Sequence, residues 1–581
     1  MNFLRLLVAL VISSIFVTTS AFFSPALLAS ERVGDFSLLD HNGYFHSMSW
    51  YDDVSVIALL VQSNGSSTDP QAVPEYQRLK QRLSGENVEF FMINPMGLKD
   101  RDEVRERMSA FGSDIPVLMD DAQLIAEALN ITVTGEVLLY DPRSFHVIFR
   151  GPIGGELESA MRAISAGNSP GVTQVSAAGD PVVYAARSAH QAEVPSYDRD
   201  IAPIIAEHCA KCHREGGIAP FAMDSHTMVQ GWSPMIREVV MTKRMPPGQI
   251  DPHVGDFSNS MVLPDHQAQQ LLHWIAAGAP MNAAGPDPLL ALEWPDSRWA
   301  FGEPDYVIKI PPQEIPATGV LDYYNVVVPI TIASDRWVRA SQYIPGDRTV
   351  LHHTLHSIIP PGAQRGGSLL GGDDPDRPDI APYIPGQDPR MEPADTGGLL
   401  KAGTTIAMQM HYTTTGRATV DESEIGVWFY PEDVVPKQRM SGACACVFTP
   451  TWTHIPPHDP DFEMSAFITI DQDAELFSLT PHMHFRGKRM RFTATYPDGQ
   501  REELINIANY NYNWQLAYTF SQPKFIPAGT IITADGAFDN STRNKNNPDP
   551  DRSVPWGLQS WDEMFFGAAD WKVLNQVGAT Q

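Results

Sequence analysis

Leu-Phe-Ser-Leu-Thr-Pro-His-Met-His, residues 476–484, is an apolar strand pattern that ends in two histidines. In an extended strand, residues two apart project from the same face, so His482 and His484 can bind one metal ion together. Short alternating segments of this kind, separated by Gly, Pro and Asn turns, follow one another through the second half of the chain. This pattern predicts two all-β, jelly-roll-like sandwich domains, over residues 301–450 and 451–581.

Three more histidines and one methionine belong to the same β-patterned region. His352 and His353 are adjacent, and neighbours in a regular strand point to opposite faces, so binding one metal with both needs a bend or a change of ring nitrogen. His411 ends the alternating strand 405–410, and Met564 lies near the C-terminus. Imidazoles suit copper, zinc, iron and nickel, whereas a thioether partner favours Cu(I). Packing alone does not explain such a set, and we expect it to bind metal.

A different motif precedes the β region. Cys209-Ala210-Lys211-Cys212-His213 has the Cys-x-x-Cys-His spacing, in which two thiols can bond both vinyl groups of one haem while His213 ligates the iron. The alternatives are an accidental match or a structural zinc site. Zinc would need two further ligands close by, and the spacing of His208 and His226 is poor for that role.

The segment around this motif, residues 196–283, has the pattern of a compact helical unit. Arg-Met-Pro-Pro at residues 244–247 resembles the segment that supplies the second axial ligand in small bacterial cytochromes c, and it singles out Met245. Met235 and Met241 compete for that role. We therefore expect an all-α cytochrome c domain with one covalently bound haem c, held by Cys209, Cys212, His213 and Met245.

Residues 31–165 form an α/β pattern that resembles the thioredoxin and peroxiredoxin superfamily. The domain holds no cysteine, the loop 63–67 reads Ser-Asn-Gly-Ser-Ser, and Gly135 stands where that superfamily places a cis-proline. Without a thiolate it has no nucleophile for peroxide or disulfide exchange, so we interpret it as a degenerate fold kept for docking or structure. The expected elements are the strands 54–61, 88–93, 136–140 and 146–150 and the helices 76–83 and 122–129.

Residues 310–570 as a whole resemble the copper type II, ascorbate-dependent monooxygenases, the family of dopamine β-monooxygenase and peptidylglycine α-hydroxylating monooxygenase. That family binds two copper ions, one through a His-His pair and a later histidine, the other through a His-x-His pair and a distant methionine. The matching residues are His352, His353 and His411 at the electron-transfer copper, and His482, His484 and Met564 at the O2-binding copper. The resemblance implies insertion of one oxygen atom of O2 into a C–H bond of a small organic substrate.

The chain also departs from that family. Thr480 stands where the peptide-amidating enzymes carry an arginine two residues before the His-x-His pair, so a glycine-extended peptide is not the expected substrate. The family's disulfides have no counterpart. Cys444 and Cys446 enclose a loop too short for an unstrained bridge, and their role is open between a surface hairpin and a third metal site.

The N-terminal segment indicates the localisation of the protein, and the net charge limits its partners. Residues 1–21 have the pattern of a signal peptide, with Arg5 before the apolar run 6–17, which is shorter than the roughly 20 residues of a membrane span. We expect a periplasmic or secreted protein without a stable membrane span after cleavage. A net charge of −28 argues against nucleic-acid partners. Residues 166–195, rich in Ser, Ala, Gly and Pro, suit a linker.

The resemblance implies a copper monooxygenase that uses O2 and receives its electrons from an external donor, an ascorbate-like reductant or a redox protein. The fused haem offers a route for these electrons, and direct reduction of copper by ascorbate is the alternative. Two alternatives belong to other classes. One is a non-catalytic haem and copper protein that transfers electrons or handles copper. The other is an interaction scaffold whose domains are degenerate.

Overall fold

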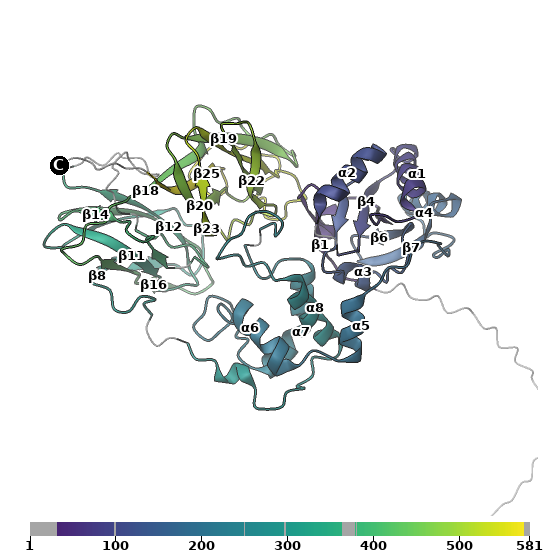
Figure 1. The fold of residues 1–581 in the computed structure, drawn as a ribbon, viewed down its shortest axis with the longest axis horizontal. Coiled ribbons are helices and arrows are strands. Elements are labelled where there is room, and N and C mark those ends of the chain that lie inside the picture. Colours follow the sequence, from purple (N-terminus) through teal and green to yellow (C-terminus); the bar gives the residue numbers. More distant parts are fainter. Residues whose placement is uncertain are drawn as a thin grey trace, which may run out of the picture.

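The computed structural model describes residues 32–97, 100–248, 250–294, 298–362, 378, 380–387 and 389–574, so the expected signal peptide, residues 1–21, lies outside the described residues. Figure 1 shows an N-terminal α/β domain, a helical unit, and two β-domains that carry the rest of the chain. No helix in the described part is long and apolar enough to cross a membrane.

The N-terminal domain is built on one seven-stranded sheet with the order β2-β1-β5-β4-β3-β6-β7. Within it, β3 and β4 are parallel, β6 is antiparallel to β3, and β7 is antiparallel to β6. The order β7-β6-β3-β4 is the thioredoxin arrangement, which confirms the predicted thioredoxin-like fold. The strands are β1 (Ser37–Asp40), β2 (Phe45–Ser47), β3 (Val56–Val61), β4 (Val88–Asn94), β5 (Val117–Met119), β6 (Glu136–Asp141) and β7 (His146–Pro152).

The two faces of this sheet are covered differently. Helices α1 (Asp69–Arg82), α2 (Arg101–Phe111) and α4 (Gly155–Ser165) pack on one face. The other face is covered by α3 (Leu124–Ala128) and by residues of the helical unit, Met241, Ala268 and Leu272, which belong to the same buried cluster. The cysteine-free domain and the helical unit therefore share one hydrophobic core.

The segment expected to be a linker, residues 166–195, is partly structured. Helix α5 (Ala185–Ala192) packs against α8 (Asp265–Ala276) of the helical unit, and Pro181 forms an isolated bridge with Val133. Asp180 accepts hydrogen bonds from the Ser66 hydroxyl at 2.9 Å and from the Ser67 amide at 2.6 Å, in the loop after β3. The difference has two causes: alanine-rich residues favour a helix, and the carboxylate of Asp180 ties the chain to the α/β domain.

The helical unit has a small core of its own. It contains η2 (Tyr197–Ile201), α6 (Ala202–His208), α7 (His226–Met241) and α8 (Asp265–Ala276), and η3 (Pro288–Ala291) follows it. Trp274 is fully buried at the centre, where its indole N–H donates to the carbonyl of Pro280 at 3.0 Å. The cysteine motif begins directly after α6.

Each β-domain has two antiparallel sheets around its own core, and the first domain also has a two-stranded sheet, β16-β9. In the first domain one sheet has the order β10-β15-β12 and the facing sheet has the order β13-β11-β17-β8, with β14 also paired to β11. Its strands are β8 (Tyr306–Lys309), β9 (Gln313–Ile315), β10 (Tyr324–Pro329), β11 (Arg336–Ile344), β12 (Leu351–Ile359), β13 (Arg390–Met391), β14 (Gly398–Leu400), β15 (Thr405–Tyr412), β16 (Thr419–Asp421) and β17 (Glu424–Phe429).

The second β-domain has sheets with the orders β18-β25-β20-β23 and β19-β24-β21-β22. Its first strand, which starts at Met440, pairs with its last, so the second domain begins by residue 440, earlier than the expected boundary at 450. The strands are β18 (Met440–Val447), β19 (Phe462–Ile470), β20 (Ala474–His482), β21 (Gly487–Thr495), β22 (Arg501–Ile507), β23 (Tyr518–Ile526), β24 (Thr530–Phe538) and β25 (Phe565–Val573).

Cys444 and Cys446 form a disulfide, although their spacing predicts a loop too short for an unstrained bridge. Both lie in β18, where residues two apart face the same way, and their Cα atoms are 5.2 Å apart. That separation is within the range of ordinary disulfides. The pair therefore lies within a paired strand and offers no free thiolates for a third metal site.

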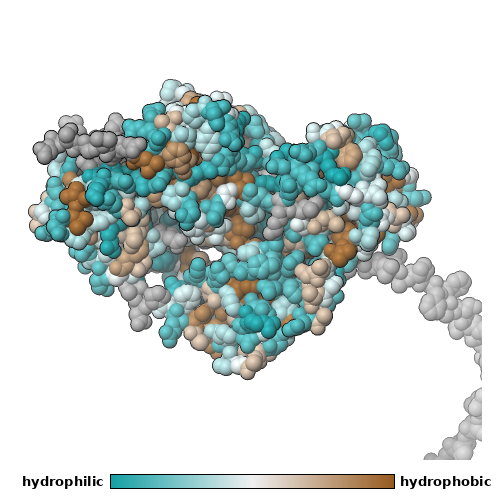
Figure 2. Space-filling view, viewed as in Figure 1, coloured by the Kyte–Doolittle hydropathy of each residue, from teal (hydrophilic) through white to brown (hydrophobic). Residues whose placement is uncertain are grey.

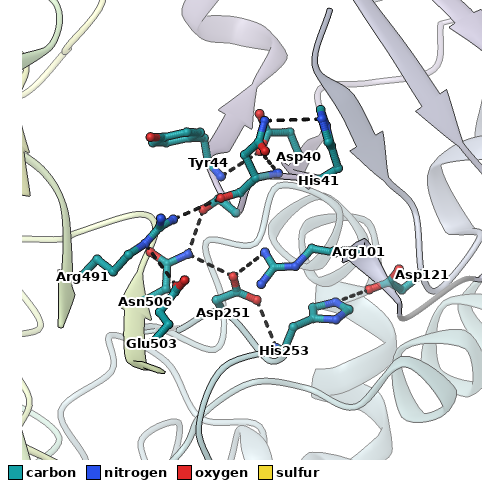
Figure 3. A network of polar contacts seen from close by, with 12 residues as sticks. Asp40, His41, Tyr44, Arg101, Asp121, Asp251, His253, Arg491, Glu503 and Asn506 are labelled. Atoms are coloured by element: carbon teal, nitrogen blue, oxygen red, sulfur yellow. Dashed lines mark hydrogen bonds and ion pairs between the residues drawn. The ribbon is translucent and has the colours of Figure 1, made fainter. Parts of the chain in front are cut away.

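The α/β domain, the helical unit and the second β-domain meet at a buried polar junction (Figure 3). The Arg101 guanidinium, at the start of α2, donates to the Asp251 carboxylate at 2.6 Å, and the Asn506 side-chain amide donates to the same oxygen at 3.0 Å. Gly43 has a φ of +79°, and a Cβ there would lie 2.8 Å from both Arg101 and Asn506. The close approach of the three parts therefore depends on this glycine.

Candidate metal centres and haem cavity

The first histidine site lies on two paired strands. His353 of β12 is directly opposite His411 of β15, and the register shifts between Leu351 and His353. This irregularity supplies the bend that the adjacent pair requires. The Nδ1 atoms of His352 and His353 are 2.8 Å apart, and one nitrogen from each of the three histidines lies within 4.8 Å of the others. No other group of three such ligands was found in the described part of the chain.

The protonation of this site favours metal binding. His352 Nε2 donates to the Asn513 side-chain oxygen at 3.3 Å, which leaves the lone pair of Nδ1 directed at His353. Burial lowers the pKa of His352 to about 4 and that of His411 to about 3. Burial also holds the pKa of His353 well below its usual value. Three neutral imidazoles therefore converge, as a metal ion requires.

The second site lies where β20 ends. The rings of His482 and His484 are 5.2 Å apart between centroids and nearly perpendicular. His482 Nδ1 donates to the Gln515 side-chain oxygen at 2.5 Å, and His484 Nδ1 donates to the carbonyl of Asp562 at 3.3 Å. Metal-binding histidines commonly donate their other ring N–H to such partners, so both Nε2 atoms are available to a metal. Burial lowers the pKa of His482 to about 4.

Met564 is brought to this second site by the residue before it. The fully buried Glu563 carboxylate accepts the backbone N–H of His484 at 2.8 Å and that of Arg486 at 2.7 Å. Burial raises the pKa of Glu563 to about 8. Met564 is 5% exposed, and Phe566, two residues on, pairs with His482 in the sheet. The distant methionine of the sequence therefore belongs to the same corner of the fold as the His-x-His pair.

The cysteine motif opens into a cavity of about 880 Å³ between the helical unit and the β-domains. Figure 2 shows a hollow between these parts of the molecule. Cys209, Cys212 and His213 line the cavity from one side, and His352 and Trp514 line it from the other. A volume of this size accommodates a large ligand.

The side chains of the motif are compatible with the attachment of a haem. His213 Nδ1 donates to the carbonyl of Phe221 at 3.0 Å, which leaves Nε2 available to an iron ion. Burial raises the pKa of Cys209 to about 12 and also raises the pKa of Cys212. Lys211, Arg214 and Arg348 also line the cavity, and their positive charges suit the two carboxylates of haem.

The structure separates the three candidate axial methionines. Met245 and Met235 both line the cavity and are 37% and 46% exposed. Met241 is 5% exposed and packs in the core shared with the α/β domain, so it is not available as a ligand. His226, offered for a zinc site, instead donates through Nε2 to the carbonyl of Ala279 at 3.0 Å.

Three functional candidates were missed in the sequence, and all lie in one loop between β22 and β23. Asn513 and Gln515 hold His352 and His482, and the hydroxyl of Tyr512 lies 3.1 Å from Nδ1 of His411. The signal was the run Asn-Tyr-Asn-Tyr-Asn-Trp-Gln at residues 509–515. It combines aromatic rings with amides in a turn, which is unusual for a loop between surface strands.

No protein-family profile and no curated protein matches this chain. Among solved structures, a hypothetical protein from Sinorhizobium meliloti is 22% identical over 26% of this chain and 92% of its own length, with a TM-score of 0.24. A conserved protein from Geobacillus kaustophilus is 18% identical over 27% of this chain and 91% of its own, with a TM-score of 0.24. A putative thiol:disulfide interchange protein from Chlorobium tepidum is 12% identical over 24% of this chain and 95% of its own, with a TM-score of 0.21. The thioredoxin-like assignment rests on the strand order described above.

Proposed function

We propose that this chain is an exported copper-dependent monooxygenase. It would hydroxylate a C–H bond of a small organic substrate with O2, and an external donor would supply its electrons through a c-type haem. The observation that carries the proposal is the presence of two separate groups of buried imidazoles, three in one and two in the other, with Met564 in the same corner of the fold as the second group.

The donor chemistry fits copper at both sites. His352, His353 and His411 would hold one ion, and His482, His484 and Met564 would hold the other. A thioether favours the reduced ion, which is the form that reacts with O2. When bound, the two coppers supply O2 activation and storage of the second electron. Cys209 and Cys212 would bond the haem, and His213 and Met245 would supply ligands to its iron.

The chain's own residues prepare these sites. Burial keeps the imidazoles neutral, Asn513 and Gln515 fix which ring nitrogen faces the metal, and Glu563 holds the backbone that presents His484. Each of these contacts orients a ligand side chain or the backbone that carries it.

A second candidate function is electron transfer or copper handling without substrate oxidation. It is favoured by the cavity that the Cys-x-x-Cys-His motif shares with His352, because an electron carrier needs only neighbouring haem and copper sites and no site for an organic substrate. Incorporation of oxygen from ¹⁸O2 into an organic product separates the two: the monooxygenase forms such a product and the carrier does not.

The first test is the haem and copper content of protein exported to a bacterial periplasm, measured by a pyridine haemochrome spectrum and elemental analysis. We expect one haem and two coppers per chain. Replacing His353 or His482 with alanine removes about one copper each, while His458→Ala, at an exposed histidine paired with Asp551, removes none. Haem without copper after copper loading would contradict the proposal.

A further inference from the structure

One loop contacts every candidate redox site of the chain. Residues 510–515, Tyr-Asn-Tyr-Asn-Trp-Gln, lie between β22 and β23, and we call them the connecting loop. The loop is a defined turn, because the Trp514 amide donates to the Asn511 carbonyl at 2.9 Å and the Asn513 amide donates to the Asn511 side-chain oxygen at 3.0 Å. Its side chains therefore project in fixed directions.

Two residues of the connecting loop hold the second histidine site. Gln515 accepts from His482 Nδ1 at 2.5 Å. The Tyr510 hydroxyl donates to the carbonyl of Met483 at 2.7 Å and accepts its amide at 2.9 Å, between the two histidines of the pair. Tyr510 and Gln515 are 6% and 5% exposed, so these bonds are protected from water.

Two other residues face the cysteine motif and the first histidine site. Asn513 accepts from His352 Nε2 at 3.3 Å, and it lines the same cavity as Cys209 and Cys212. Trp514 forms part of the cavity wall beside Gly386, where a Cβ would lie 3.1 Å from the indole ring. Trp514, which forms part of the cavity wall, and Asn513, which accepts the hydrogen bond from His352, are thus consecutive residues.

Tyr512 contacts both histidine sites. Its ring stacks on His352 with centroids 4.7 Å apart at 18°, and its hydroxyl lies 3.1 Å from His411 Nδ1. The same ring meets His484 edge-on at 6.1 Å between centroids. A single buried side chain, 8% exposed, therefore separates the two sites.

We propose that the connecting loop carries electrons from the haem cavity to both histidine sites and positions their ligands, an inference that rests on the proposed function. One electron at a time leaves ferrous haem, which becomes ferric, and reduces copper(II) to copper(I); no bond is made or broken. Asn513 and Trp514 lie on the route from the haem cavity to the first histidine site, and Tyr512 lies on the route from the first histidine site to the second. All are positioning residues.

The test uses full-length protein loaded with haem and copper, with the copper(II) EPR spectrum of each site defined by the His353→Ala and His482→Ala variants. Asn513→Leu should alter the spectrum of the first site alone, and Gln515→Leu that of the second site alone. Each should weaken copper binding at its own site about 10- to 100-fold, the usual effect of losing an outer hydrogen bond.

Tyr512→Leu is the decisive variant, and Tyr323→Leu is its matched control. Tyr323 packs on His411 with centroids 4.9 Å apart and on His353 at 6.1 Å, within the first site. Tyr323→Leu should therefore alter the copper(II) spectrum of the first site only, whereas Tyr512→Leu should alter the spectra of both sites. Tyr512→Leu should also slow the anaerobic reoxidation of haem by copper(II) more than Tyr323→Leu does. Tyr512→Phe retains the ring, so the second-site spectrum should return to that of the unaltered protein.

The outcomes separate the two proposals. If the unaltered protein binds haem but no copper, the proposed function fails. If it binds both, and Tyr512→Leu affects the second-site spectrum and the reoxidation rate no more than Tyr323→Leu does, the role of the connecting loop is overturned and the proposed function stands. If Tyr512→Leu does not fold, Asn513→Leu and Gln515→Leu decide: copper(II) spectra and a haem reoxidation rate unchanged in both variants would overturn the role of the connecting loop.

Discussion

Replacing Arg101 should loosen the three-way junction far more than replacing a surface arginine. The side chains of Arg101 and Asp251 are 9% and 0% exposed, and their charged atoms are 2.6 Å apart. Arg101→Met leaves the Asp251 carboxylate buried without its cation, which typically costs about 3–5 kcal/mol. At about 1.4 kcal/mol per factor of ten, opening of the junction should become roughly 100- to 5000-fold more frequent.

Hydrogen exchange measures this opening at the Asp251 amide, which donates to the Asn506 carbonyl at 2.9 Å. The control is Arg543→Met. Arg543 of the second β-domain pairs with Asp53 of the α/β domain, two of the three parts that meet at the junction, but the two side chains are 32% and 52% exposed. An exposed pair contributes about 0–1 kcal/mol. Equal exchange in the Arg101 and Arg543 variants would refute the reasoning. A double change, Arg101→Met with Asp251→Leu, should restore part of the protection.

Three further predictions concern pH, the second histidine site and the haem motif. The hydrogen bond to Asp121 raises the pKa of His253 above its ordinary value. The stability that this pair contributes is therefore complete below about pH 6.5 and is lost as pH rises through the raised pKa. Thermal unfolding followed from pH 6 to 9 should show this loss, and the His253→Gln variant should lose less stability over the same range. Glu563→Leu leaves two buried backbone N–H groups without acceptors, at about 1–3 kcal/mol each, and should lower copper content at the second site while the first-site EPR signal persists. A double change of Cys209 and Cys212 to serine should abolish covalent haem but retain two coppers, and turnover with the native donor at an undiminished rate would contradict electron delivery through the haem.

Local patterns predicted much of the fold. Alternation along β15 and β20 indicated strands that end in histidines, and the βαβ order of the N-terminal domain indicated its thioredoxin-like sheet. These features depend on the period of hydrophobic residues along one segment, which a sequence displays directly.

The contacts between distant segments could not be predicted in the same way. The β-bulge between Leu351 and His353 decides whether both histidines of the pair can face one ion, and it depends on pairing with β15. The contacts of Tyr512 with His352 and His484 join three segments of the chain, and no local period encodes them. The strand pairing of β18 with β25 likewise set the domain boundary and the geometry of the Cys444–Cys446 bridge.

An anaerobic reductive titration of the fully oxidised protein, followed by haem absorbance and copper EPR, tests the central claim most directly. The account predicts three electrons per chain, one for the haem and one for each of two coppers, with the copper signals lost in variants of His353 and His482. Uptake of a single electron by the haem alone, in protein exposed to excess copper beforehand, would contradict it.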